Sequence, residues 1–182
     1  MFFKTMQNIA VDMLEPLSYL PYGAAAGILL VMATEIRRRC CGKGTWTKRR
    51  RILCFLYGVY FMVCAEQTFL SREPGSRTGV DWQLFGTIGG SAQSYAYFVE
   101  NILLCIPLGI LLPYGFRRLQ KPQYCILAGM LFSVALEVLQ LVTQRGHFQV
   151  DDIVTNTLGT AIGWGVFWWL RRKGGENYLS KS

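Results

Sequence analysis

The sequence predicts an all-α membrane protein: a single domain over residues 1–170 and a basic, disordered cytoplasmic tail over residues 171–182. Hydrophobic residues make up 52% of the 182-residue chain, and its mean hydropathy is +0.26. Both values exceed those of ordinary soluble domains. The apolar residues occur in blocks close to the ~20 residues that a helix needs to cross a bilayer. These observations together predict a bundle of about five transmembrane helices.

Each predicted element follows from a change between apolar and polar sequence. Residues 1–16 place apolar and polar side chains on opposite helix faces, which predicts a short interfacial helix that ends at Pro16. The polar segment between residues 71 and 94 is predicted to form a loop, with Trp82 and Phe85 as interfacial anchors. The predicted spans are residues 17–34, 52–70, 95–114, 124–143 and 151–170.

The distribution of lysine and arginine predicts the orientation of the chain. Of the 19 basic residues, all but Lys4, Arg72, Arg77 and Arg145 fall on one side of the membrane when five spans alternate. The positive-inside rule places that side in the cytoplasm, so the N-terminus is predicted outside and the C-terminus inside. Nucleic-acid binding is disfavoured despite the net charge of +8, because it requires basic residues spread over a folded polar face.

No cofactor or metal site is predicted. The six cysteines include no CxxC pair, and four of them fall inside apolar blocks. The other two, Cys40 and Cys41, lie in a loop predicted to be cytoplasmic, so all six are interpreted as apolar fillers or loop thiols. The one histidine, His147, is interpreted as a solvated loop residue rather than a catalytic base.

The acidic residues concentrate toward the outer side. At 1.5 Å per residue, Glu66 and Glu137 are expected ~20 Å along helices that begin at the inner face. Glu100 is expected about two turns below the outer face. Three helices are therefore predicted to present a carboxylate at a similar level. Ionisable groups at membrane depth indicate a functional site by default.

Two polar helix faces are predicted near the end of the chain. Glu137, Gln140 and Gln144 recur at i, i+3 and i+7, so they are predicted to share one face. On the next helix a GxxxG pattern lies below a polar head and permits close approach of another helix. That second face holds Asp152, Asn156, Gly159 and Gly163.

Two interpretations of these polar residues stay open. In the first, they line a polar pocket open to the outside, with Arg72 and Arg145 as counter-charges able to bind a phosphate or carboxylate. In the second, they are structural: a carboxylate caps a helix, Asn156 joins helices, and Glu137 pairs with Arg145. The pocket interpretation predicts as ligand-binding residues Glu66, Thr68, Arg72, Glu100, Asn101, Glu137, Gln140, Arg145, Asp151, Asp152 and Asn156.

Several separated motifs resemble, in order, those of the VanZ-like family of bacterial membrane proteins. They are TFLSR at 68–72, WQLFGT at 82–87, ENILLCIPLGILLP at 100–113, Glu137-x-x-Gln140, and VDDIVTNTLGTAIGW at 150–164. The resemblance covers about residues 57–170. Two positions depart from the family pattern: Gln149 replaces the first Asp of Asp-x-Asp-Asp, and Arg145-Gly146 reverses the usual Gly-Arg. Matched family positions are Thr68, Arg72, Asn101, Pro107, Glu137, Gln140, Asp152, Asn156 and Gly159.

The resemblance implies a multi-pass protein of the bacterial plasma membrane with a role in the cell envelope. The family is named for a glycopeptide-resistance protein associated with lowered teicoplanin susceptibility. We therefore expect an outward-facing pocket that binds a lipid-linked cell-wall precursor or a lipoglycopeptide, with membrane lipids as further partners. The alternative is a membrane enzyme acting on an isoprenoid- or peptidoglycan-linked substrate with a divalent cation. A transporter is disfavoured because no inverted repeat is present. The oligomeric state is left open.

Overall fold

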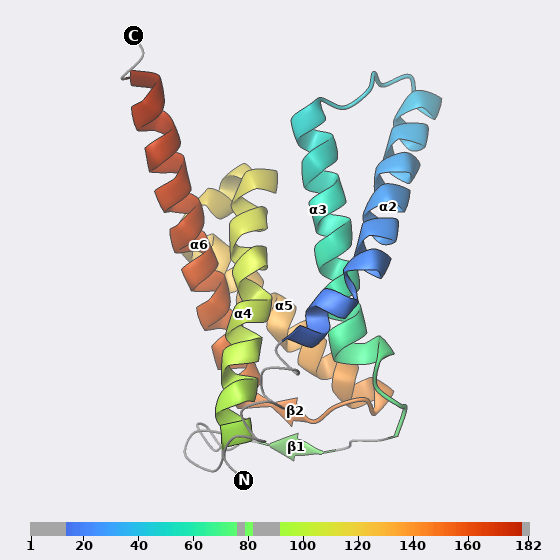
Figure 1. Ribbon diagram of the computed structural model, residues 1–182, viewed down its shortest axis with the longest axis vertical. Helices are drawn as coiled ribbons and strands as arrows, with labels where there is room; N and C mark the ends of the chain where they lie inside the picture. Colours follow the sequence, from blue (N-terminus) through green and yellow to red (C-terminus); the bar gives the residue numbers. More distant parts are fainter. Residues whose placement is uncertain (1–13, 76–78, 82–91, 180–182) are drawn as a thin grey trace. The chain divides into compact units, whose positions relative to one another are not determined.

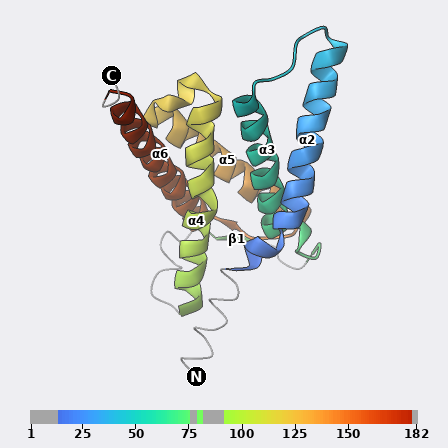
Figure 2. The same ribbon diagram turned by 45° about the horizontal axis from the view of Figure 1, so that its top comes forward.

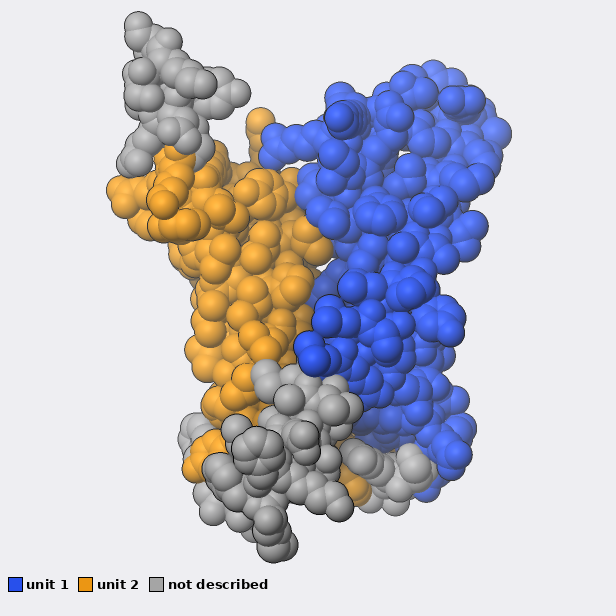
Figure 3. All heavy atoms as spheres, viewed as in Figure 1, with its two compact units in different colours: residues 1–78, 142–146 blue, residues 79–141, 147–182 orange. Residues whose placement is uncertain are grey.

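The computed structural model describes residues 14–75, 79–81 and 92–179, and these are almost entirely helical, as the sequence predicts (Figure 1). The chain divides into two compact units, which Figure 3 distinguishes by colour. Most of the predicted interfacial helix and both predicted aromatic anchors lie outside the described residues. Residues 14–18 are helical, so Pro16 does not end that helix. Unit 1 comprises Met1–Thr78 and Val142–Gly146, and unit 2 comprises Gly79–Leu141 and His147–Ser182.

Unit 1 is built on a hairpin of two helices, α2 (Leu20–Cys40) and α3 (Lys48–Ala65), which lie side by side in both ribbon views (Figures 1 and 2). Their backbones touch where glycines meet. A Cβ added at Gly58 would lie 2.6 Å from Gly27 Cα, and one added at Gly27 would lie 2.8 Å from the Phe55 carbonyl oxygen. Both distances are too short for a methyl group, so these positions require glycine.

Unit 2 contains three long helices: α4 (Ala92–Gly115), α5 (Pro122–Thr143, whose last residues belong to unit 1) and α6 (Val150–Leu179). A short 3₁₀ turn, η2 (Arg117–Gln120), connects α4 to α5. Helices α4 and α6 lie side by side in both ribbon views, and theirs is the most extensive packing between helices in the described chain.

The predicted GxxxG of α6 is the surface on which α4 packs. A Cβ at Gly159 would overlap the carbonyl oxygen of Ile102, and a Cβ at Gly163 would overlap that of Ile106. A glycine of α4 takes part in the same way, because a Cβ at Gly109 would lie 2.9 Å from the backbone nitrogen of Trp164. The prediction that these glycines permit close helix approach is therefore confirmed.

A two-stranded ladder, absent from the sequence predictions, precedes α6. Strand β1 (Val80–Asp81) pairs in parallel with β2 (Phe148–Gln149), and Val80 lies opposite Phe148. The Phe148 N–H donates to the Gly79 carbonyl at 3.0 Å. Because β2 leads directly into Val150, the ladder fixes the start of α6.

Three helical segments among the described residues are long and apolar enough to cross a membrane: Lys48–Leu70, Tyr95–Gly115 and Pro122–Thr143. They correspond to the second, third and fourth predicted spans. The first and fifth predicted spans are also helical, but α2 and α6 continue beyond them into basic sequence. The sequence predicts a disordered tail from residue 171, whereas α6 continues through Arg171, whose Nη1 donates to Gln120 Oε1 at 2.6 Å.

Candidate functional site

The C-terminal end of α3 changes from α-helical to π-helical hydrogen bonding over Glu66–Leu70. The Ser71 N–H donates to the Glu66 carbonyl at 3.1 Å, which is the i to i+5 bond of a π turn. Thr68 is buried, and its hydroxyl donates to the Cys64 carbonyl at 2.6 Å. The sequence predictions place Glu66 and Thr68 on a regular helix. The π turn instead changes the directions in which the side chains at the C-terminal end of α3 point.

Arg72 and Arg145, the two predicted counter-charges, meet within unit 1. Arg145 Nη1 donates to the Phe69 carbonyl at 2.7 Å, on the π turn. Arg72 Nη1 donates to the Arg145 carbonyl at 3.4 Å. Both side chains are half-buried. Segments far apart in the sequence are thus joined by these two arginines, which we call the arginine pair.

The turn after α5 positions Arg145. Helix α5 ends at Thr143, and Gln144 adopts a left-handed conformation with φ of 55°. This conformation reverses the chain at a helix end and is unfavourable for any residue but glycine or asparagine. The prediction that Gln144 shares a helix face with Glu137 and Gln140 is therefore wrong, because Gln144 is exposed beyond the helix while the other two are buried.

Asn156 joins three helices of unit 2. Its side-chain amide donates from Nδ2 to Ser133 Oγ of α5 at 2.9 Å, and its Oδ1 accepts from Cys105 Sγ of α4 at 3.3 Å. Asn156 is 3% exposed and Ser133 is fully buried. These contacts are those expected of the structural interpretation, in which Asn156 holds helices together.

Asn101 and Asp152 form a second link between α4 and α6. Asn101 Nδ2 donates to Asp152 Oδ1 at 2.8 Å. Asn101 precedes Cys105 by four residues and Asp152 precedes Asn156 by four, so the two links lie one helical turn apart. On the N-terminal side of the α6 glycines, α4 and α6 are therefore joined by successive polar contacts along one face.

Glu137 is a buried carboxylate in unit 2, at 2% exposed. Its Oε2 accepts the Gln149 N–H at 2.8 Å, so it fixes the residue immediately before α6. The structural interpretation of the sequence pairs Glu137 with Arg145, and it does not predict this backbone contact to Gln149. A carboxylate that accepts a backbone N–H retains a role in folding whatever else it binds.

The remaining predicted residues of unit 2 lie on the same three helices. Glu100 precedes Asn101 on α4 and is half-buried, Gln140 is buried on α5, and Asp151 is buried in the first turn of α6. Carboxylates in a first helical turn interact favourably with the helix dipole. His147 is exposed, as expected of a solvated loop residue.

No group of three or more His, Cys, Asp or Glu side chains within residues 14–75, 79–81 and 92–179 is arranged to hold a metal ion. The sequence predicts carboxylates at a similar level on three helices. A similar level does not by itself bring them within coordination distance of one ion. The enzyme alternative with a divalent cation therefore gains no support from the described residues.

Sequence reasoning missed Ser133 and Cys105, and a signal for both was present. Ser133 lies four residues before Glu137, and Cys105 lies four residues after Asn101, so each shares a helix face with a predicted polar residue. Small polar side chains on such a face are typical of interhelical hydrogen bonds in membranes. By contrast, no pattern in the sequence indicated the π turn.

Long apolar helices, a glycine-mediated helix contact and buried polar links between helices define a helical membrane protein. The VanZ/LLP1 family profile matches residues 45–171, and the chain belongs to this family. The predicted resemblance over about residues 57–170 is thereby confirmed.

One relative is Protein VanZ of Enterococcus faecium, which is 25% identical over 71 residues. The matched segment covers 38% of this chain and 43% of that protein, so it spans less than half of the relative. No solved structure matches the chain.

Proposed function

We propose that this VanZ-like membrane protein resides in the bacterial plasma membrane as a multi-pass protein and binds an amphiphilic envelope ligand through the arginine pair. The ligand would be a lipid-linked cell-wall precursor or a lipoglycopeptide, and its binding would lower susceptibility to teicoplanin. The observation that carries this proposal is the meeting of Arg72 and Arg145 beside the π turn.

The geometry of the arginine pair suits an anionic head group. Arg145 donates from one nitrogen, Nη1, to the Phe69 carbonyl. The other N–H groups of its guanidinium can donate to a phosphate or carboxylate. The contact from Arg72 to the Arg145 carbonyl is 3.4 Å, long for an N–H···O bond. A charge-assisted bond from Arg72 to a ligand would be shorter and stronger than this contact. Because both arginines are half-buried, water screens their attraction for an anion only in part.

The other predicted site residues divide by role under this proposal. Asn101, Asp152 and Asn156 support the fold of unit 2, since each has a hydrogen-bond partner on a neighbouring helix. Thr68 supports the π turn through its bond to Cys64. The residues proposed to contact the ligand are Arg72 and Arg145, with Glu66 of the same unit as a further polar contact.

Glycopeptide susceptibility tests the proposal in cells. Teicoplanin carries an acyl chain and vancomycin does not, so action at the lipid level predicts protection that is selective for teicoplanin. Arg72→Gln and Arg145→Gln should each remove most of it, because losing a charge-assisted hydrogen bond costs about 1.5–3 kcal/mol, or tenfold or more in affinity. Arg117→Gln is the matched control, since it removes the same charge from the exposed turn η2.

Binding is measured on the purified proteins in lipid nanodiscs, with teicoplanin and vancomycin as probes and microscale thermophoresis as the readout. Immunoblots of membranes confirm equal amounts of each variant. Equal protection against both antibiotics would contradict action at the lipid level. Retention of full binding and full protection by both arginine variants would show that the arginine pair is not the site.

A further inference from the structure

The closed end of the α2–α3 hairpin concentrates positive charge. Helix α2 ends with Arg37, Arg38 and Arg39, and α3 begins with Lys48–Arg51. Most of these side chains are exposed. The sequence predicts this end of the hairpin to be cytoplasmic, where anionic lipids attract basic segments next to the membrane.

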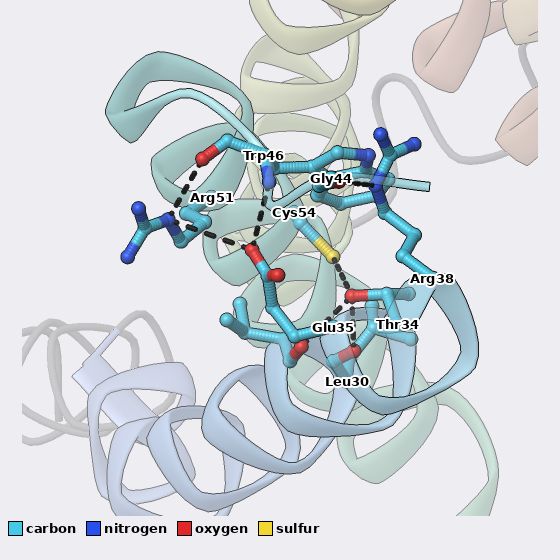
Figure 4. Close-up of polar contacts among 9 residues, drawn as sticks. Leu30, Thr34, Glu35, Arg38, Gly44, Trp46, Arg51 and Cys54 are labelled. Atoms are coloured by element: carbon cyan, nitrogen blue, oxygen red, sulfur yellow. Dashed lines mark hydrogen bonds and ion pairs between the residues drawn. The ribbon is translucent and has the colours of Figure 1, made fainter. Parts of the chain in front are cut away.

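Glu35 and Arg51 hold the connecting loop in a defined conformation (Figure 4). Glu35 Oε1 accepts the Trp46 N–H at 3.2 Å and lies 3.5 Å from Arg51 Nε. Arg51 Nε also donates to the Trp46 carbonyl at 3.1 Å, and Arg38 Nε donates to the Gly44 carbonyl at 3.0 Å. The two terminal nitrogens of Arg51 point away from Glu35 and Trp46 in Figure 4. Arg51 is therefore positioned through Nε, with its terminal nitrogens directed outward.

An open apolar groove lies next to Arg51 within unit 1. Ile28, Val31 and Met32 of α2 line one side, and Ile52 and Phe55 of α3 line the other, with Arg51 among the lining residues. Ile28 is 54% exposed and Met32 is 53% exposed, so this face of the hairpin is uncovered in unit 1. Apolar side chains next to a fixed guanidinium match both parts of a phospholipid: the acyl chain and the phosphate.

We propose that this groove binds one anionic phospholipid, with an acyl chain along the apolar side chains and the phosphate on the terminal nitrogens of Arg51. A guanidinium binds phosphate through two parallel hydrogen bonds, and an arginine at a membrane surface keeps its stem in the apolar region. The site differs from the arginine pair, which lies at the opposite end of α3, and the proposal does not depend on the proposed function.

Charge argues for an anionic lipid rather than a second copy of the chain. The segment from Arg37 to Arg51 carries eight basic residues and no acid. Two copies packed by this face would bring their basic clusters together, which like-charge repulsion opposes. A zwitterionic lipid would gain less binding free energy, because its own cationic group would lie near the same basic residues.

Native mass spectrometry of delipidated protein in detergent tests the proposal, with phosphatidylglycerol and phosphatidylcholine of identical acyl chains as probes. We expect selective binding of phosphatidylglycerol. Arg51→Gln should weaken it by on the order of tenfold, since a charge-assisted contact is lost. Arg50→Gln is the matched control, because it removes the same charge from an exposed neighbour outside the groove, and it should cost at most a few-fold.

Ile28→Trp provides an independent test, because it fills the groove and leaves the contacts of the loop intact. It should weaken binding of both lipids by blocking the acyl chain. Equal losses in Arg50→Gln and Arg51→Gln would overturn the proposal in favour of general electrostatic attraction. Unchanged binding in Ile28→Trp, equal binding of the two lipids, or a stable dimer that excludes lipid would each overturn it as well.

Discussion

Replacing Gly163 by alanine should destabilise the protein, although alanine is the better helix former. The added methyl group would overlap the Ile106 carbonyl oxygen and lie 2.9 Å from Gly109 Cα. Both neighbours are backbone atoms of α4, so no side chain can rotate away to make room. Helices α4 and α6 would have to separate, which would also stretch the Asn101–Asp152 hydrogen bond of 2.8 Å.

Gly165→Ala is the matched control for Gly163→Ala. Gly165 lies on the same helix, and a Cβ added there meets nothing within 4 Å. Gly165→Ala should therefore show the intrinsic gain of alanine in a helix, up to about 1 kcal/mol. Gly163→Ala should lose about 1–3 kcal/mol through overpacking. The two variants are expected to shift the free energy of unfolding in opposite directions, by a total of ~2–4 kcal/mol.

Titration of sodium dodecyl sulfate into protein held in a mild detergent measures this difference, with tryptophan fluorescence reporting the folded fraction. Size-exclusion chromatography before titration confirms that each variant starts as the same species. Equal unfolding midpoints for Gly163→Ala and Gly165→Ala would refute the inference that α4 and α6 pack backbone to backbone. A destabilised Gly165→Ala would refute the assignment of open space at that position.

Two further predictions concern the turn after α5 and the polar links of unit 2. Gln144→Gly should stabilise the protein by up to about 1 kcal/mol, because a φ of 55° is strained for glutamine but unstrained for glycine. An unchanged or lower unfolding midpoint would contradict this prediction. In a double-mutant cycle, Asn101→Ala and Asp152→Ala should couple by about 0.6–1.7 kcal/mol, the range for interhelical hydrogen bonds in membranes. Strict additivity of the two variants would show that their contact contributes nothing.

The sequence was sufficient to predict the helices, because apolar blocks of bilayer length leave few alternatives. The second predicted span, residues 52–70, ends at the same residue as the π turn that completes α3. The ends of α2 and α6 could not be predicted in the same way. A hydropathy boundary shows where apolar sequence stops, but helical hydrogen bonding continues through arginines such as Arg37 and Arg171.

Periodicity in the sequence identified one glycine-mediated helix contact but not the other. Gly159 and Gly163 were found because they continue a polar face, and they do contact α4. Gly23 and Gly27 have the same spacing on α2, with Gly58 opposite on α3. They lie among alanines without a polar residue nearby, so nothing in the sequence distinguished this pattern from a chance match.

The candidate site was only partly accessible to sequence reasoning. Spacing correctly grouped Asp152 with Asn156, because a helical face is a local property. The meeting of Arg72 with Arg145 depends on a π turn and a left-handed residue, and neither follows from hydropathy. Irregular backbone thus determines where these two charged side chains lie, which is why their contacts required the structure.

The parallel ladder before α6 constrains the order in which the chain can assemble. Its two strands, Val80–Asp81 and Phe148–Gln149, are separated in sequence by the whole of α4 and the whole of α5. During synthesis β1 stays unpaired with β2 until α4, α5 and β2 have left the ribosome. Closing so long a loop early would be entropically unfavourable. The ladder should therefore form late, so a nascent chain ending before residue 148 should remain open to proteases at residues 79–81.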